Sequence, residues 1–171
     1  MRARGRGRGK ALLVVGGILL LAGASLCAQK ESPSPRDLLK QGNEFFKAQN
    51  WKEAIASYRK ALELKPDYAE AHFGLADVFG ATQDFPNAIH EYQEVLKLRP
   101  DFPGVHTDLG ALYESQGQLP QAIEEYRAAV RQQPDDAQVH VGLGNALTSA
   151  RQFPEAAQEF HHALALKPRD A

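Results

Sequence analysis

One spacing recurs along most of this chain and limits its fold more than any other feature. An alanine returns every 34 residues, at Ala54, Ala88, Ala122 and Ala156. A proline returns at the same interval, at Pro66, Pro100, Pro134 and Pro168. A fixed period of this length is typical of repeat architectures, in which short units stack on copies of themselves. The period predicts four units, 35–68, 69–102, 103–136 and 137–170.

Each unit has the apolar spacing of two amphipathic helices, which is clearest in the third unit. Leu109 and Tyr113 fall on one face of a first helix, and Ala122, Tyr126 and Ala129 fall on one face of a second. The repeated unit is therefore expected to be a pair of antiparallel helices, and the chain to be all-α.

Glycine and proline residues predict where these helices begin and end. Gly117, between the two helices of the third unit, can adopt the left-handed backbone that ends a helix. Prolines are tolerated in the first turn of a helix and are expected to begin the second helix in three units, at Pro86, Pro120 and Pro154. The second helix is expected to end before the periodic proline of its unit, because proline disfavours helical geometry in the preceding residue.

The residues at these positions resemble the tetratricopeptide repeat, whose pattern combines an aromatic residue, Leu-Gly, Tyr, Ala, a second aromatic residue, Ala and Pro. The third unit matches this pattern with Leu109, Gly110, Tyr113, Ala122, Tyr126, Ala129 and Pro134. The departures from it are Gln41, Leu147, and histidines where tryptophan is typical, at His72, His106 and His140. The resemblance implies a right-handed α-solenoid of four helix-turn-helix units.

In this family the first helices form a concave groove that holds extended or helical segments of other proteins. The resemblance implies that the following side chains line it: Arg36, Leu39, Lys40, Asn43, Lys47, Glu70, Phe73, Asp77, Thr107, Asp108, Glu114, Gln138, Asn145 and Thr148. The groove is basic in the first unit, acidic in the second and third, and neutral in the fourth. This charge order favours a partner segment with a basic or amide-rich middle.

Small residues at groove positions admit two interpretations. Gly74, Gly80 and Gly142 leave room for a bulky side chain of the partner, or they are tolerated because these positions face solvent. Gly104 and Asp108 occupy groove positions where chaperone-binding members of the family carry basic residues. The sequence therefore disfavours capture of a chaperone's terminal carboxylate.

Residues 1–27 have the three-part layout of a bacterial export signal. Five basic residues come first, an apolar run extends from Ala11 to Leu26, and the chain becomes polar at Gln29. Small residues permit cleavage after Ala24 or after Cys27. The chain is therefore expected to leave the cytoplasm, most simply for the periplasm.

Two alternatives would attach the chain to a membrane. The apolar run approaches the ~18 residues of a spanning helix, so residues 1–27 could remain as an inner-membrane anchor. Cys27 could instead be lipidated, although Leu26 fits the lipoprotein motif poorly. Residues 28–34 are expected to form an extended linker, because their prolines disfavour a helix.

Charge and residue content argue against several other functions. After the export signal the chain has 15 basic and 21 acidic residues, which disfavours nucleic acid as a partner. The only cysteine is Cys27, so the repeats have no thiolate chemistry. The four units fill nearly all of the chain after the export signal, and no phosphate-binding loop or hydrolase motif occurs, so we expect no enzyme activity and no cofactor.

The histidines raise the question of a metal site. Equivalent positions on successive repeats are separated by a helix spacing of ~8 to 10 Å, whereas ligands must converge on an ion at ~2.0 to 2.1 Å. His72, His106 and His140 are therefore interpreted as packing residues. His161 and His162 diverge around their helix and are interpreted as a surface pair. No metal site is expected.

The sequence ends at Ala171, directly after the fourth unit, so Leu164 and Leu166 have no following helix to cover them. We expect weak self-association through these leucines.

These observations predict a non-catalytic interaction scaffold of the bacterial cell envelope. Two alternatives stay open: an accessory, substrate-presenting subunit of an envelope enzyme or secretion complex, and a membrane-anchored assembly factor that acts by oligomerising.

Overall fold

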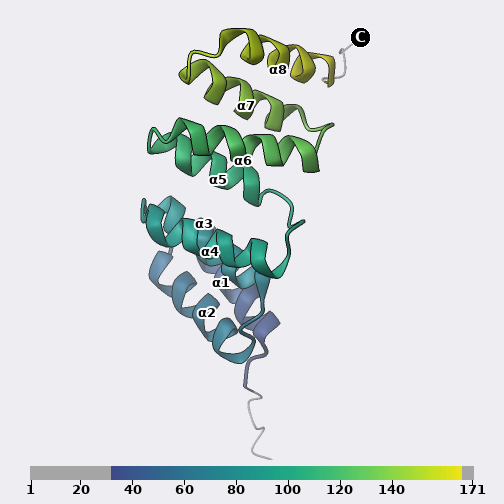
Figure 1. The fold of residues 1–171 in the computed structure, drawn as a ribbon. Helices are drawn as coiled ribbons and strands as arrows, with labels where there is room; N and C mark the ends of the chain where they lie inside the picture. The colour runs from purple at the N-terminus through teal and green to yellow at the C-terminus, as the bar shows by residue number, and fades with distance from the viewer. Residues whose placement is uncertain (1–31, 167–171) are drawn as a thin grey trace, which may run out of the picture. The chain divides into compact units, whose positions relative to one another are not determined.

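A computed structural model describes residues 32–166, which form eight α-helices and no strand. The helices are α1 (Pro35–Lys47), α2 (Trp51–Leu64), α3 (Ala69–Ala81), α4 (Phe85–Leu98), α5 (Val105–Ser115), α6 (Leu119–Gln132), α7 (Ala137–Ser149) and α8 (Phe153–Leu166). Each odd-numbered helix packs against the helix that follows it, and the pairs stack in chain order (Figure 1). The expected all-α solenoid is confirmed.

Local sequence sets the helix ends. At the start of α1, Ser34 Oγ accepts a hydrogen bond from the backbone N–H of Asp37 at 3.2 Å, and the Asp37 carboxylate accepts one from the N–H of Ser34 at 3.1 Å. Proline is the second residue of α4, α6 and α8, as expected. Helices α2, α4 and α6 end two residues before Pro66, Pro100 and Pro134, also as expected.

The same tight turn joins the two helices of every pair. One residue in each turn has a left-handed backbone, with φ of 58° at Gln49, 61° at Gln83, 70° at Gly117 and 60° at Arg151. The conformation predicted for Gly117 is confirmed. The other three turns adopt it without glycine, at a steric cost that glycine would avoid.

Two tyrosine rings fill the space between successive repeats. Tyr58 is 1% exposed and lies between Gly42 of its own repeat and Gly74 of the next, where an added Cβ on Gly74 would be 2.6 Å from Tyr58 Cζ. Tyr126 lies in the same way against Gly142, whose added Cβ would be 2.7 Å from Tyr126 Cε1. Both interpretations of these two glycines from the sequence are wrong, because the tyrosine of the preceding repeat takes the space.

The connection between α4 and α5 departs from the period. Gly104 has a φ of 87° and precedes α5, which begins at Val105, two residues later than a 34-residue shift of α3 would place it. The expectation that Gly104 lies within the first helix of its unit is therefore wrong, because a residue with a left-handed backbone does not continue a right-handed helix. Asp108 stands where Gly74 and Gly142 stand in the neighbouring repeats, so a side chain is present at this interface in place of a hydrogen atom.

The predictions for residues 1–27 and for most of the linker lie outside the described residues. Ser32, Pro33 and Ser34 are described and are not helical. Within residues 32–166, no helix combines the length and apolar character that crossing a membrane requires.

Candidate functional site

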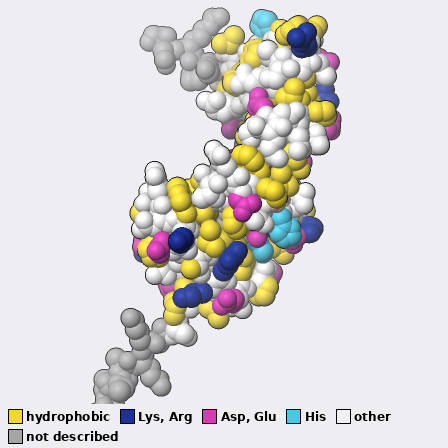
Figure 2. Space-filling view, turned by 90° about the vertical axis from the view of Figure 1, so that its left-hand side faces the viewer, with side chains coloured by type: hydrophobic (Ala, Val, Ile, Leu, Met, Phe, Trp, Pro, Cys, Tyr) yellow, Lys and Arg dark blue, Asp and Glu magenta, His cyan; other side chains and the backbone are white. Residues whose placement is uncertain are grey.

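Helices α1 and α3 and the α4–α5 connection surround a hollow of ≈ 440 Å³. We call it the α1–α3 hollow. Its lining residues are Leu39, Asn43, Phe46, Lys47, Tyr58, Glu70, Phe73, Gly74, Asp77, Phe102 and Pro103. On the face of the molecule shown in Figure 2, hydrophobic side chains are exposed between charged side chains of both signs. The hollow likewise combines hydrophobic and charged side chains.

Aromatic side chains form the apolar part of the hollow. Phe73 of α3 stacks on Phe102 of the α4–α5 connection, with 5.2 Å between ring centroids and 24° between ring planes. Phe73 also meets Tyr92 edge to face at 5.6 Å, and Arg99 lies over the Phe102 ring at 4.6 Å from its centroid. We call the stacked Phe73 and Phe102 rings the aromatic floor of the hollow. Both rings are partly exposed, so the aromatic floor offers an apolar surface that neighbouring side chains hold in place.

Tyrosine hydroxyls from the second helices reach polar side chains of the first helices. Tyr58 donates to Asn43 Oδ1 at 2.8 Å, and Tyr92 donates to Asp77 Oδ1 at 2.6 Å. Burial raises the pKa of Tyr58 to about 12, and the nearby Asp77 charge adds to the shift. These hydroxyls stay protonated and act as fixed donors, so they hold Asn43 and Asp77 in place beside the hollow.

The two aspartates of the groove are partly buried and lie near one another. Burial raises the pKa of Asp77, although the hydrogen bond from Tyr92 opposes the shift. Burial and the negative charge of Asp77 raise the pKa of Asp108 to about 7. No lysine or arginine contributes to either shift. A cation close to these two carboxyl groups would favour their ionised forms.

The hollow gathers part of the predicted groove. Six of the predicted residues line it: Leu39, Asn43, Lys47, Glu70, Phe73 and Asp77. Arg36 and Lys40 line an adjoining depression that also includes Leu39 and Asn43. The remaining six lie farther along, on α5 and α7, and do not line the hollow: Thr107, Asp108, Glu114, Gln138, Asn145 and Thr148.

Sequence reasoning missed three residues of the hollow. Tyr58 belongs to a second helix but reaches past Gly42 and Gly74 to the groove side. Phe102 and Pro103 belong to the connection that departs from the period. The sequence signal for Phe102 and Pro103 is the run Phe102-Pro103-Gly104, which combines an aromatic residue with two helix-breaking residues where the first helix of the third unit was expected to begin.

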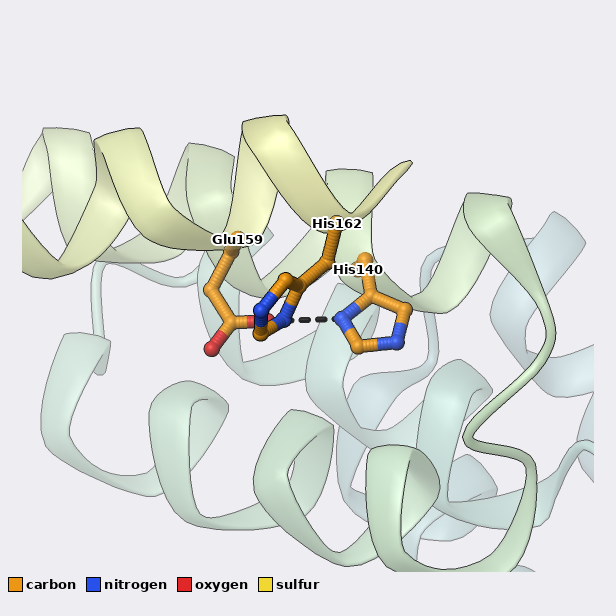
Figure 3. Close-up of side chains that lie close together, drawn as sticks. All are labelled: His140, Glu159 and His162. Atoms are coloured by element: carbon orange, nitrogen blue, oxygen red, sulfur yellow. Dashed lines mark hydrogen bonds and ion pairs between the residues drawn. The ribbon is translucent and has the colours of Figure 1, made fainter. Parts of the chain in front are cut away.

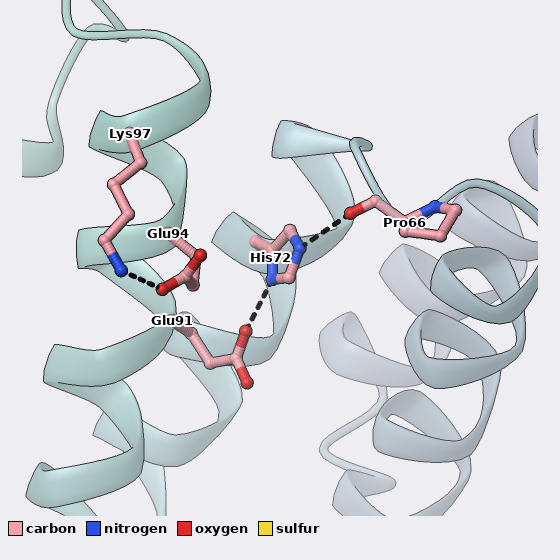
Figure 4. Close-up of polar contacts among 5 residues, drawn as sticks. All are labelled: Pro66, His72, Glu91, Glu94 and Lys97. Carbon is pink, nitrogen blue, oxygen red and sulfur yellow. Dashed lines mark hydrogen bonds and ion pairs between the residues drawn. The ribbon is translucent and has the colours of Figure 1, made fainter.

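In the second, third and fourth repeats, a periodic histidine of the first helix contacts a glutamate of the second helix. Nδ1 lies 2.6 Å from a glutamate oxygen in the His72–Glu91 pair, and 2.7 Å in the His106–Glu125 and His140–Glu159 pairs. His72 also contacts the Pro66 carbonyl through Nε2 at 3.1 Å (Figure 4). The hydrogen bond with Glu91 raises the pKa of His72, despite an opposing effect of burial. These histidines therefore tie helices together through polar contacts as well as by packing.

The outer face of the last helix pair carries an exposed leucine. Leu164 is 67% exposed, whereas its equivalents Leu62, Leu96 and Val130 are partly buried and pack against core clusters. Leu166 is only partly exposed. The expected exposure of Leu164 is thus seen, and among the described residues no further helix lies beyond it to cover it.

Comparison with known proteins identifies the class. Residues 42–83 match the family described as TPR repeat, and residues 80–145 and 115–171 match the family described as tetratricopeptide repeat. No curated protein sequence matches the chain. The chain belongs to the tetratricopeptide repeat family.

Solved structures of MamA share this fold. One crystal structure of MamA is 25% identical, with a TM-score of 0.74 over 78% of each chain. A second is 26% identical, with a TM-score of 0.72 over 77% of this chain and 72% of that one. MamA from Desulfovibrio magneticus RS-1, residues 41 to the end, is 23% identical with a TM-score of 0.76 over 84% and 82%. Family and fold together define a protein–protein interaction scaffold.

Proposed function

We propose that this scaffold is exported, has no catalysis of its own, and binds an extended or helical segment of a cell-envelope protein in the α1–α3 hollow. The observation that carries the proposal is the combination, in one hollow, of the stacked Phe73 and Phe102 rings with the partly buried carboxylate of Asp77. A segment that places an apolar side chain next to a lysine or arginine would complement both features.

The aromatic floor supports the apolar half of this partner. Phe73 and Phe102 are stacked and fixed before binding, so an apolar side chain would gain contact area without having to order them. Full burial of one leucine-sized side chain contributes about 1.5 to 3 kcal/mol. This is enough for one anchor of a peptide interface.

The aspartates support the basic half. Burial raises the pKa of both Asp77 and Asp108, and a basic side chain of the partner close to Asp77 would favour the ionised carboxylates. Glu70 is less available, because it already pairs with Arg99 at 2.7 Å. We therefore place the basic residue of the partner beside Asp77.

Crosslinking at the rim of the hollow tests the site. A photoreactive amino acid in place of exposed Lys47, which lines the hollow, should trap a partner in growing cells, and mass spectrometry would identify it. The matched control is exposed Glu63 on α2, which does not line the hollow. Equal crosslinking from both positions would move the contact to another face.

Charge removal tests the recognition. Asp77→Asn keeps the size and the acceptor for Tyr92 but removes the charge, so it should weaken capture of the crosslinked partner by about tenfold. Glu63→Gln removes an exposed charge elsewhere and should leave capture unchanged. Unchanged capture by Asp77→Asn would refute the basic partner.

Export is supported by the basic-then-apolar order of residues 1–27. Mass analysis of the mature protein would distinguish cleavage after Ala24 or Cys27 from a retained or lipidated membrane anchor. Recovery of the full-length, unmodified chain in the cytoplasmic fraction would contradict the proposed envelope location.

A second interaction, between two copies of the chain, is favoured by exposed Leu164. Its equivalents in the other three repeats are partly buried against core clusters. A second copy of the chain could cover Leu164 in the same way. We propose weak self-association at the outer face of α8.

A further inference from the structure

Three potential metal ligands converge in the last helix pair. His140 of α7 lies beside Glu159 and His162 of α8, and one ligand atom from each lies within 4.8 Å of the other two (Figure 3). Glu159 and His162 are three residues apart, so they share one face of α8. His140 meets the His162 ring edge to face, with 5.5 Å between ring centroids.

His140 is oriented as metal-binding histidines usually are. Its Nε2 lies 2.8 Å from the carbonyl oxygen of Pro134, which can only accept a hydrogen bond, so Nε2 carries a hydrogen atom. Nδ1 lies 2.7 Å from a carboxylate oxygen of Glu159, which also accepts, so without a bound ion Nδ1 carries a hydrogen atom as well. A metal ion would replace that hydrogen atom and take the Nδ1 lone pair. Bound histidines commonly donate their second ring N–H to a backbone carbonyl in this way, which fixes the ring.

The distances allow convergence with small side-chain movements. Two ligands of a tetrahedral ion at ~2.0 to 2.1 Å are about 3.3 to 3.4 Å apart. The His140–Glu159 pair is closer than this, and the three ligand atoms lie within 4.8 Å of one another. Glu159 is partly exposed and His162 is exposed, so both can rotate, whereas His140 is 5% exposed and fixed.

The other repeats show what is special about this one. The His–Glu pair occurs in three repeats, but the position of His162 is held by Glu94 in the second repeat and by Ala128 in the third. Glu94 is itself paired with Lys97 (Figure 4). Among the described residues, only the last helix pair brings two imidazoles and a carboxylate together in this way.

We propose that His140 Nδ1, a carboxylate oxygen of Glu159 and an imidazole nitrogen of His162 bind one divalent transition-metal ion of the zinc type. Two imidazoles and one carboxylate form a donor set suited to Zn²⁺, with a fourth position open to water or to a donor from a partner. The ion would link α7 to α8 and so clamp the last helix pair. The sequence analysis compared the periodic histidines with one another and His161 with His162, and so did not combine His140 with the Glu-x-x-His spacing of Glu159 and His162 within α8.

The test is calorimetric titration of the full chain with Zn²⁺ at pH 7.5, with circular dichroism to check folding. We expect one site with a Kd on the order of micromolar. His162→Ala should weaken binding at least about tenfold. The matched control is His161→Ala, which removes the adjacent exposed imidazole, whose Nδ1 instead contacts the Ala157 carbonyl at 2.7 Å, and should leave affinity unchanged.

A gain-of-site variant gives a second measurement. Ala128→His adds the missing imidazole beside the His106–Glu125 pair of the third repeat, so the bound Zn²⁺ should rise from one ion to two. No binding by the unaltered chain at concentrations up to about 1 mM, or equal affinity in His162→Ala, would overturn the proposal. A loss with His161→Ala as large as with His162→Ala would also overturn it.

Discussion

Adding one methyl group at Gly74 tests the packing of the tyrosine between repeats. Gly74 lies in the middle of α3, where alanine is otherwise the better residue for a helix by about 1 kcal/mol. An added Cβ would lie 2.6 Å from Tyr58 Cζ and 2.7 Å from Tyr58 Cε1, well inside ordinary contact distance. The Tyr58 ring has no free space on its other side, because Gly42 closes it, and its hydroxyl is held by Asn43 at 2.8 Å.

The two effects can be weighed. Overpacking of this kind costs about 1 to 3 kcal/mol, which equals or exceeds the gain in helix propensity. We expect Gly74→Ala to lower the free energy of unfolding by up to about 2 kcal/mol, and the melting temperature by about 2 to 4 °C for each kcal/mol.

The same helix supplies the control. An added Cβ on Gly80 would meet only Leu112 Cδ2 at an ordinary 3.7 Å, so Gly80→Ala should stabilise the chain by up to about 1 kcal/mol. Urea unfolding followed by circular dichroism measures both. In the Tyr58→Leu background the penalty of Gly74→Ala should disappear. If Gly74→Ala proves as stable as Gly80→Ala, the ring does not fill this space and the reasoning is wrong.

Three further predictions concern single side chains. Because the raised pKa of His72 means that folding favours its protonated form, its pair with Glu91 should stabilise fully below the unfolded pKa of about 6.5 and lose this effect as pH rises through the folded value. Urea midpoints at pH 6 and pH 8.5 should therefore differ less in Glu91→Gln, and an unchanged difference would contradict the pairing. Gln83→Gly should raise the free energy of unfolding by about 1 kcal/mol, because Gln83 has a φ of 61°; a loss of stability would show that its side chain matters more than its backbone. Leu164→Glu should abolish concentration-dependent association in analytical ultracentrifugation, and persistent association would place the contact elsewhere.

Asp108 links the irregular connection to the proposed binding site. It replaces the glycine that the neighbouring repeats place against a tyrosine ring, and it lies near enough to Asp77 for the two charges to interact. At the same interface, α5 begins two residues later than the period predicts, directly after Gly104 with its left-handed backbone. The departure from regular stacking therefore coincides with the partly buried carboxylates.

Helix positions were the predictable part of this protein. The ends of α2, α4 and α6 follow from Pro66, Pro100 and Pro134, and the left-handed turn follows from Gly117. These features depend on contacts between residues a few positions apart, which a single sequence displays directly. The class of fold follows as well, because helix pairs with one apolar face must stack to bury it.

Side chains that meet across helices were decided only by the tertiary structure. The period places Gly74 in the groove, where it lines the hollow, but only the packing of α3 on α2 shows that the Tyr58 ring lies against it. The sequence separates His140 from His162 by 22 positions, and the packing of α7 on α8 brings their rings together. Spacing along one helix determines which side chains share a face. The distance and crossing angle between two packed helices depend on all the side chains between them, so a local sequence pattern does not determine which side chains meet.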